Sequence, residues 1–138
     1  MYLGRPIGGQ SYGVAGMKRV IFDSSFLMAV AESPTTWFED IVQEVGEFQP
    51  MLLTCVKDEL VRLASGQGRR ALSARVALEM ASSFSEGRCG GASVDDEIES
   101  SALTLGALVA TTDSGLRGSL RAAHVEIVSL RRGRVSVG

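Results

Sequence analysis

The sequence predicts a three-layer α/β/α domain built around a mainly parallel central sheet. Short apolar segments alternate with amphipathic segments of helical period along the chain, which is the pattern of strands joined by helical crossovers. The strand segments are apolar without alternation, as expected for a sheet covered on both faces. With 138 residues, of which 45% are hydrophobic and 22% charged, the chain has the size and balance of one globular domain.

The N-terminal part of the predicted domain begins with a buried strand and two helices. Residues 20–22 are apolar and predict the first strand, and residues 24–31 predict a short helix. Ser33 offers an N-cap and Pro34 a first helical position for the next helix. Apolar side chains then recur at helical spacing until Gly46, which ends that helix.

The central part predicts a second strand and a pair of helices. Residues 51–54 follow Pro50 and form a short apolar strand, and residues 56–64 have helical apolar spacing. Residues 65–68 break this helix, and residues 69–84 predict another. Its apolar side chains recur every four residues and are Leu72, Val76, Met80 and Phe84. The exposed parts of this helix and of the helix after Pro34 are candidate homodimer contacts.

The C-terminal part continues the alternation. Residues 87–93 are rich in glycine and predict a loop, and residues 95–105 predict a helix. A strand over 107–111, a helix over 114–122 and a last strand over 125–130 complete the pattern. In a parallel sheet of this kind, the binding crevice lies beyond the carboxyl ends of the strands.

The ends of the chain differ in composition from its middle. Residues 1–16 contain several glycines and no helical period, so we expect a flexible leader, with Met17 as a candidate start of the compact domain. The expected domain is residues 17–132, followed by a short tail, 133–138. The longest mostly apolar stretch is far shorter than the ~18 residues that a membrane span requires. No secretory signal pattern is evident, so we expect a cytoplasmic protein without membrane association.

The charge pattern gives a local rather than a global signal. The formal net charge is −2, so the chain lacks an overall basic signature for nucleic acid. Arginines nevertheless concentrate after residue 115; they are Arg117, Arg121, Arg131, Arg132 and Arg134. From the charge count alone, a solvated surface is the favoured interpretation and a polyanion-binding surface is the alternative.

The two cysteines do not form a metal-binding pattern. Cys55 and Cys89 are far apart in the sequence, and no CxxC or Cys/His cluster accompanies them, which argues against zinc. Cys55 lies in an apolar run and is most simply a small buried residue, with a disulfide as the alternative. His124, the single histidine, is expected in a loop rather than as a catalytic base.

Four acidic residues are placed where this fold would bring them together. Asp23 directly follows the first strand, and Asp113 follows a later strand and the pair Thr111-Thr112. Glu59 and Asp95 fall on the intervening helices. Three of them have a simpler interpretation alone: a helix cap for Asp23 and Asp113, and a solvated helix residue for Glu59. Four carboxylates that converge would repel one another unless a divalent cation held them, so together they predict a metal site.

The neighbouring acids have structural explanations. Ser93 and Asp96 fit a capping pattern at the start of the helix, which leaves Asp95 as the better candidate ligand and Asp96 as a cap or outer-shell residue. Glu97 and Glu99 are expected on the exposed face of the same helix, near the positive end of its dipole.

Four segments resemble, in order, the acidic motifs of PIN-domain ribonucleases; they are residues 20–25, 56–60, 95–103 and 108–113. The first ends in Asp-Ser-Ser, like the opening strand of that family, and the last ends in Thr-Thr-Asp, like its final strand. In the third, the family's aspartate precedes an aliphatic residue by three positions, which selects Asp95. The resemblance covers residues 17 to about 132 and implies a PIN-like domain.

The resemblance implies an endoribonuclease that depends on Mg²⁺ or Mn²⁺. The implied ligands or organisers of the metal are Asp23, Glu59, Asp95 and Asp113. Ser25 and Thr111 are implied as supporting hydroxyls, and the implied substrate is single-stranded or looped RNA. Arg117 and Arg121, at i and i+4 beyond Asp113, share a helix face and are expected to contact backbone phosphates.

The biological role stays open among three interpretations. Residues 69–84 and the segments around Asp95 and Asp113 are similar to archaeal relatives of the eukaryotic pre-rRNA-processing endonuclease, so rRNA processing is the first expectation. The toxin of a toxin–antitoxin pair is the second, and the short span between Glu59 and Asp95 disfavours it. The third is a catalytically weak RNA-binding assembly factor, which the retention of all four acids disfavours.

Overall fold

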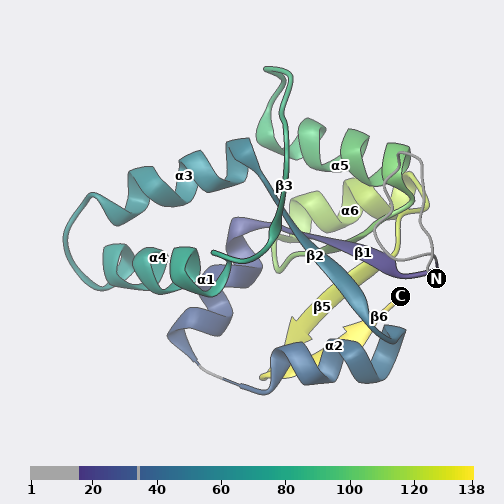
Figure 1. The fold of residues 1–138 in the computed structure, drawn as a ribbon, viewed down its shortest axis with the longest axis horizontal. Helices are drawn as coiled ribbons and strands as arrows, with labels where there is room; N and C mark the ends of the chain where they lie inside the picture. The colour runs from purple at the N-terminus through teal and green to yellow at the C-terminus, as the bar shows by residue number, and fades with distance from the viewer. Residues whose placement is uncertain (1–15, 34) are drawn as a thin grey trace.

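A six-stranded, mainly parallel sheet runs through the centre of the computed structural model, which describes residues 16–33 and 35–138 (Figure 1). The strands are β1 (Lys18–Phe22), β2 (Phe48–Leu53), β3 (Ser85–Gly87), β4 (Leu108–Ala110), β5 (Ile127–Arg131) and β6 (Arg134–Val137). Their order in the sheet is β3-β2-β1-β4-β5-β6, and only β5 and β6 pair antiparallel. The predicted α/β architecture is confirmed.

Helices flank the sheet in two groups. They are α1 (Ser24–Glu32), α2 (Trp37–Val45), α3 (Thr54–Ala64), α4 (Arg69–Met80), α5 (Val94–Leu105) and α6 (Ser114–Ala122). Helices α1, α3 and α4 pack on one another at one end of the molecule, whereas α5 and α6 pack together beside β1, β4 and β5 (Figure 1). Helix α2 lies against β6.

The connectivity creates a crevice at the carboxyl end of β1. From β1 the chain builds outward through β2 to β3, and it then returns to the other side of β1 to add β4, β5 and β6. Neighbouring β1 and β4 therefore send their following segments in different directions, which is the switch point where parallel α/β sheets form binding sites. Asp23 and Asp113 follow these two strands.

The core is built on the central strands. Val20, Ile21 and Phe22 of β1 are fully buried. The ring of Phe22 lies 5.6 Å from that of Trp37 and 5.1 Å from that of Phe84, measured between ring centroids. These contacts join the central strand to α2 and to the segment after α4, so the aromatic cluster fixes the elements that surround β1.

Helix α4 presents a different face to the core than its sequence predicted. It ends at Met80 rather than at residue 84, and its buried positions are Ala71, Ser73, Ala74 and Ala77. Leu72 is 57% exposed and Val76 is 36% exposed. A four-residue repeat drifts by about 40° per step on a helix of 100° per residue, so the predicted stripe cannot stay on one face. The exposed patch lies where the sequence analysis placed a homodimer contact, and the homodimer stays a prediction.

Further element boundaries were predicted wrongly. Helix α2 begins at Trp37 with Thr36 as its N-cap residue, so Ser33 caps the end of α1 instead of the start of α2; Pro34 lies outside the described residues. Strand β2 begins at Phe48, before Pro50, and Thr54 already belongs to α3. Pro50 is tolerated because β3 pairs with β2 only from Met51 onward.

Two short strands were not predicted. Strand β3 lies between the expected helix, 69–84, and the expected glycine-rich loop, 87–93, and shares only Gly87 with that loop; it has only three residues, none of them large and apolar. Strand β6 falls in the expected tail, 133–138, and pairs with β5 through a tight turn in which Arg132 and Gly133 both have positive φ. The expected leader, apart from Gly16, lies outside the described residues. Each helix of the described residues is too short or too polar to span a lipid bilayer.

Candidate functional site

The four predicted acids line one cleft at the carboxyl edge of the sheet. The cleft has a volume of about 420 Å³, and its lining includes Asp23, Glu59, Asp95 and Asp113. Strand ends supply Asp23 and Asp113, and helices α3 and α5 supply Glu59 and Asp95. The structure thus brings together every residue that the sequence analysis proposed as a metal ligand.

Asp23 is the buried anchor of the cleft. Its side chain is only 6% exposed. Its Oδ2 accepts hydrogen bonds from the Ser25 hydroxyl at 2.5 Å and from the Thr111 hydroxyl at 2.8 Å. Among the described residues, no group donates to its Oδ1, so one oxygen is held in place and the other remains available to the cleft. Asp23 is also the N-cap residue of α1 but makes no side-chain cap hydrogen bond, which argues against the simple capping interpretation.

The two supporting hydroxyls orient Asp23 and Asp113 together. The Ser25 hydroxyl accepts a hydrogen bond from the Thr112 amide at 3.0 Å, and the Thr111 hydroxyl accepts one from the Asp113 amide at 3.0 Å. Each hydroxyl therefore accepts from the β4–α6 turn and donates to Asp23. This network fixes the ends of β1 and β4 relative to each other, because connected hydrogen bonds in a buried site restrain one another.

Asp113 both caps a helix and lines the cleft. Its side chain is exposed and lines the cleft, while its Oδ1 accepts the Leu116 amide at 2.9 Å as the N-cap of α6. Capping uses one oxygen only, so the carboxylate is oriented by the helix and still faces the cleft.

Glu59 is held by a residue that the sequence analysis did not single out. The hydroxyl of Ser24, the first residue of α1, donates to Glu59 Oε1 at 2.9 Å. Ser24 directly follows Asp23, but nothing in the sequence indicates that a helix 35 residues away would approach it. The contact positions Glu59 toward the strand-end acids.

The pKa of Asp95 is raised by its surroundings in the cleft. Partial burial raises its pKa, and the negative charges of Asp23, Asp113, Glu59 and Asp96 raise that pKa further. Asp96 is exposed, and its amide donates to the Ser93 hydroxyl at 3.2 Å, so Ser93 is the N-cap of α5 as predicted.

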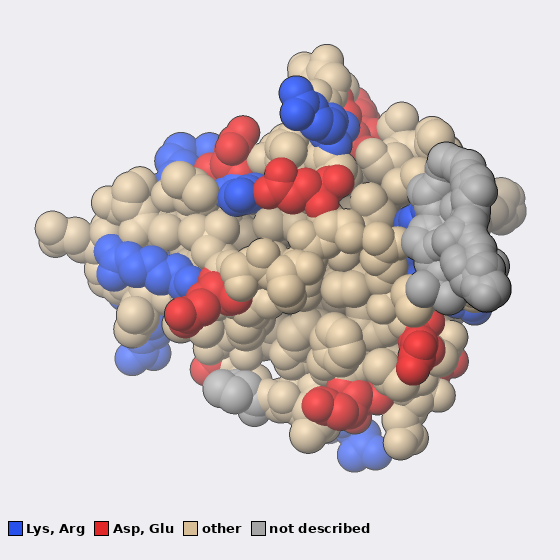
Figure 2. Space-filling model, in the orientation of Figure 1, with Lys and Arg blue, Asp and Glu red and all other residues tan. Residues whose placement is uncertain are grey.

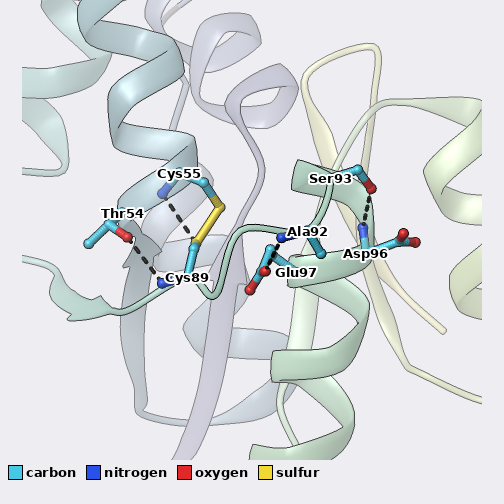
Figure 3. The surroundings of a disulfide bond; sticks show 7 residues. All are labelled: Thr54, Cys55, Cys89, Ala92, Ser93, Asp96 and Glu97. Carbon is cyan, nitrogen blue, oxygen red and sulfur yellow. Dashed lines mark hydrogen bonds between the residues drawn. A yellow bond between two sulfur atoms is a disulfide. The ribbon is translucent and has the colours of Figure 1, made fainter.

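A disulfide links helix α3, which carries Glu59, to the loop that precedes α5, which carries Asp95. Cys55, in the first turn of α3, is bonded to Cys89, in the loop before α5 (Figure 3). The Cys89 amide also donates to the Thr54 hydroxyl at 3.2 Å. Glu97 also restrains this loop, because its Oε2 accepts a hydrogen bond from the Ala92 amide at 2.8 Å. Backbone hydrogen bonds from the loop, first from Gly90, lower the pKa of Glu97. Of the two alternatives for Cys55, the structure has the disulfide.

The donor set suits a hard divalent cation, although the side chains do not enclose one. In the described part of the chain, no group of three or more Asp, Glu, His or Cys side chains is close enough to hold a metal ion. Carboxylate oxygens are the ligands that Mg²⁺ and Mn²⁺ prefer, and the lining contains no histidine or cysteine that would favour zinc. The free Oδ1 of Asp23 and the mutual repulsion at Asp95 are consistent with a cation site in this cleft.

The predicted RNA-binding arginines lie outside the cleft lining. Arg117 and Arg121 are both on α6, where Arg121 is exposed and Arg117 is partly buried. The Nε of Arg117 is buried and has no hydrogen-bonding partner among the described residues. The arginine that does line the cleft is Arg70, near the start of α4, together with Glu32 at the end of α1. Neither residue had a sequence signal, because both reach the cleft only through the packing of α1, α3 and α4.

Fold and site together define an α/β domain with an acidic cleft at its topological switch point. The sequence model of the family described as "PIN like domain" matches residues 20–134, and the chain therefore belongs to this family. A search among curated proteins finds no match.

Comparison with solved structures agrees with this assignment. The chain is similar to the PIN domain endonuclease Utp24, with 27% identity and a TM-score of 0.72 over 86% of this chain and 90% of that one. The structure of PAE2754 from Pyrobaculum aerophilum is more distant, with 17% identity and a TM-score of 0.49 over 87% of this chain and 85% of that one. The PIN nuclease fold is thus shown for this protein.

Proposed function

We propose that the protein is an endoribonuclease that depends on Mg²⁺ or Mn²⁺ and hydrolyses RNA phosphodiester bonds. The observation that carries the proposal is the convergence of Asp23, Glu59, Asp95 and Asp113 on one cleft in a chain of the PIN-like family. Similarity to the PIN domain endonuclease Utp24 supports the endonucleolytic class.

The residues of the cleft divide into ligands and positioning groups. Asp23, with its free Oδ1, and the other three acids would hold the cation. When bound, such a cation supplies the positive charge that stabilises a phosphodiester transition state, and it lowers the pKa of water so that hydroxide is accessible near neutral pH. Ser25 and Thr111 fix the rotamer of Asp23, and Ser24 fixes Glu59. Preorganised groups of this kind lower the barrier because they need no reorganisation during the reaction.

The substrate and its biological context come from the resemblance stated above. Single-stranded or looped RNA is the proposed substrate, and pre-rRNA processing is the proposed role. A toxin-type ribonuclease is the alternative role, and a catalytically weak RNA-binding assembly factor is the alternative from another class.

The enzymatic proposal is tested by RNA cleavage with purified protein. We expect Mn²⁺ or Mg²⁺ to stimulate cleavage, EDTA to stop it, and Asp23→Asn to abolish it. Asp58→Asn is the matched control, because Asp58 is an exposed acid on α3 that does not line the cleft. Absence of metal-stimulated cleavage by the wild-type protein would refute the proposal.

A second measurement separates the enzyme from the assembly factor. RNA affinity and RNA cleavage are measured together for the wild type and for Asp113→Asn. The enzyme predicts that the variant loses cleavage. The assembly factor would be favoured if the wild type binds RNA without cleaving it and if neither metal nor Asp113→Asn changes the RNA affinity.

A further inference from the structure

The acidic cleft extends beyond the four acids along helix α1. Its lining includes one residue from each successive turn of α1, from Ser24 through Met28 to Glu32. Eight residues of helix correspond to about 12 Å. Leu63, one helical turn after Glu59 on α3, lines the same extension. The cleft is therefore a groove with the four predicted acids at one end and Glu32 at the end of α1, and it is long enough to hold more than the phosphate that reacts.

Arg70 is the one cationic residue in the described lining of this groove. Its neighbours on α4, Arg69 and Leu72, line a second pocket together with Glu32 and Ser33, which places this turn of α4 at the end of α1 away from Asp23. Arg70 is the second residue of α4, which packs antiparallel to α3 after the turn at residues 65–68. Among the described residues, its exposed side chain has no ion pair and no hydrogen bond, so its guanidinium is free to bind an anion.

Two other basic residues at this end of the molecule, Arg75 and Lys57, are already engaged. Arg75 donates to the carbonyl oxygens of Ala64 at 2.9 Å and Gly66 at 3.0 Å, where it closes the α3–α4 turn. Lys57 pairs with Glu86 at 2.8 Å. In Figure 2, basic and acidic side chains are interspersed where Figure 1 places α3 and α4.

We propose that Arg70 binds a backbone phosphate of the RNA one or more nucleotides away from the scissile bond and thereby holds the strand along α1. The inference rests on the proposed function and adds a positioning residue to it. A polyanion that enters an acidic groove needs a fixed positive charge, and a planar guanidinium binds phosphate oxygens in a bidentate manner. Arg70 thus sets the path of the strand into the acids.

The test compares Arg70→Gln with Arg62→Gln. Arg62 is an exposed arginine on α3 outside the groove lining, so both variants change the net charge equally. Affinity for a fluorescent single-stranded RNA is measured by anisotropy in EDTA at several salt concentrations. We expect Arg70→Gln to weaken binding about tenfold and to reduce the salt slope by about 0.7, the contribution of one single-strand phosphate contact. Arg62→Gln should keep the wild-type slope, and Arg70→Lys should restore most of it.

Cleavage kinetics in Mn²⁺ provide the second readout. For the same RNA, Arg70→Gln should raise KM more than it lowers kcat, because the contact lies away from the scissile bond. A wild-type salt slope and a wild-type KM for Arg70→Gln, or an equal loss for Arg62→Gln, overturn the inference. If the wild type cleaves no RNA, the proposed function fails, and the binding measurement in EDTA still decides the role of Arg70.

Discussion

The hydroxyl of Ser24 donates to Glu59 Oε1 across 2.9 Å and joins the first turn of α1 to the middle of α3. This bond links the segment that directly follows β1, at one side of the cleft, to helix α3 at the other side. Because a hydrogen bond to a charged group restrains its rotamer, Ser24 decides how far Glu59 can turn away from the other acids. The site therefore depends on a residue that carries no acidic group.

Ser24→Ala is expected to lower kcat/KM for RNA about tenfold, the effect of losing one hydrogen bond to a carboxylate in the site. The physical reason is that Glu59 then samples orientations away from the cleft. The variant should also require more Mn²⁺ for half-maximal activity. Ser100→Ala, at an exposed position of α5, is the control. A Mn²⁺ requirement equal to that of the wild type would show that Ser24 does not position Glu59.

Thr111→Val is expected to reduce the free energy of unfolding by about 2 kcal/mol. Thr111 is fully buried, and its hydroxyl both donates to Asp23 and accepts the Asp113 amide. Valine therefore removes one of the two donors to the buried Oδ2 of Asp23 and the acceptor of the Asp113 amide. Urea unfolding followed by circular dichroism measures the change. Thr112→Val, whose hydroxyl makes no hydrogen bond among the described residues, should stay within about 0.5 kcal/mol of the wild type. Equal losses in the two variants would contradict the network.

Asp95→Asn is expected to stabilise the protein in EDTA at neutral pH. Burial and the neighbouring acids raise the pKa of Asp95 in the folded state, so between the ordinary and the raised pKa the folded state binds more protons than the unfolded state. Stability is consequently lost as the pH rises through that window, and asparagine removes the loss. The gain in urea midpoint should shrink as the pH falls toward the ordinary pKa of an aspartate.

Mn²⁺ should reverse this order, because a bound cation removes the repulsion that destabilises the wild type. The midpoints of wild type and Asp95→Asn are then compared with and without Mn²⁺. An Asp95→Asn variant that is less stable than the wild type in EDTA at neutral pH would refute the electrostatic account.

The double variant Cys55→Ser/Cys89→Ser is expected to lose about 3–4 kcal/mol of unfolding free energy, which is the chain-entropy effect of opening a loop of this length. The disulfide joins residues separated by 34 positions, with the α3–α4 hairpin inside the loop. Urea midpoints are measured for wild type and variant with and without a thiol reductant. Reductant should lower the midpoint of the wild type only, and a wild type insensitive to reductant would contradict a stabilising disulfide.

Local chemistry made much of the cleft predictable from sequence. Asp23 and Asp113 follow apolar strand segments, and the carboxyl ends of parallel strands meet at one edge of a sheet, so their convergence follows from the alternation of elements. The Ser93 cap was predictable because its partner amide is three residues away. The placement of the four acids in one cleft agrees with the prediction, while the roles of these acids as metal ligands stay proposals.

The rest depended on tertiary packing that local patterns do not encode. The buried face of α4 consists largely of alanines, at positions 71, 74 and 77, and packs closely against α1 and α3. Small side chains permit this close packing, whereas the larger side chains of the predicted apolar stripe would not. Strand β3 has no apolar signature and forms only because β2 supplies a partner. Arg70 reaches the groove for the same kind of reason, since its neighbours there come from other helices.

The division of the four acids between strands and helices has a consequence for hydrogen exchange. Asp23 and Asp113 adjoin central strands that are paired on both sides, so the amides beside them should exchange slowly with solvent deuterium. Asp95 lies in the first turn of α5, after an exposed loop that the disulfide and Glu97 tether, and its amides should exchange much faster. The cleft would then have one rigid wall and one adaptable wall, and protection gained on cation binding should concentrate in the first turn of α5.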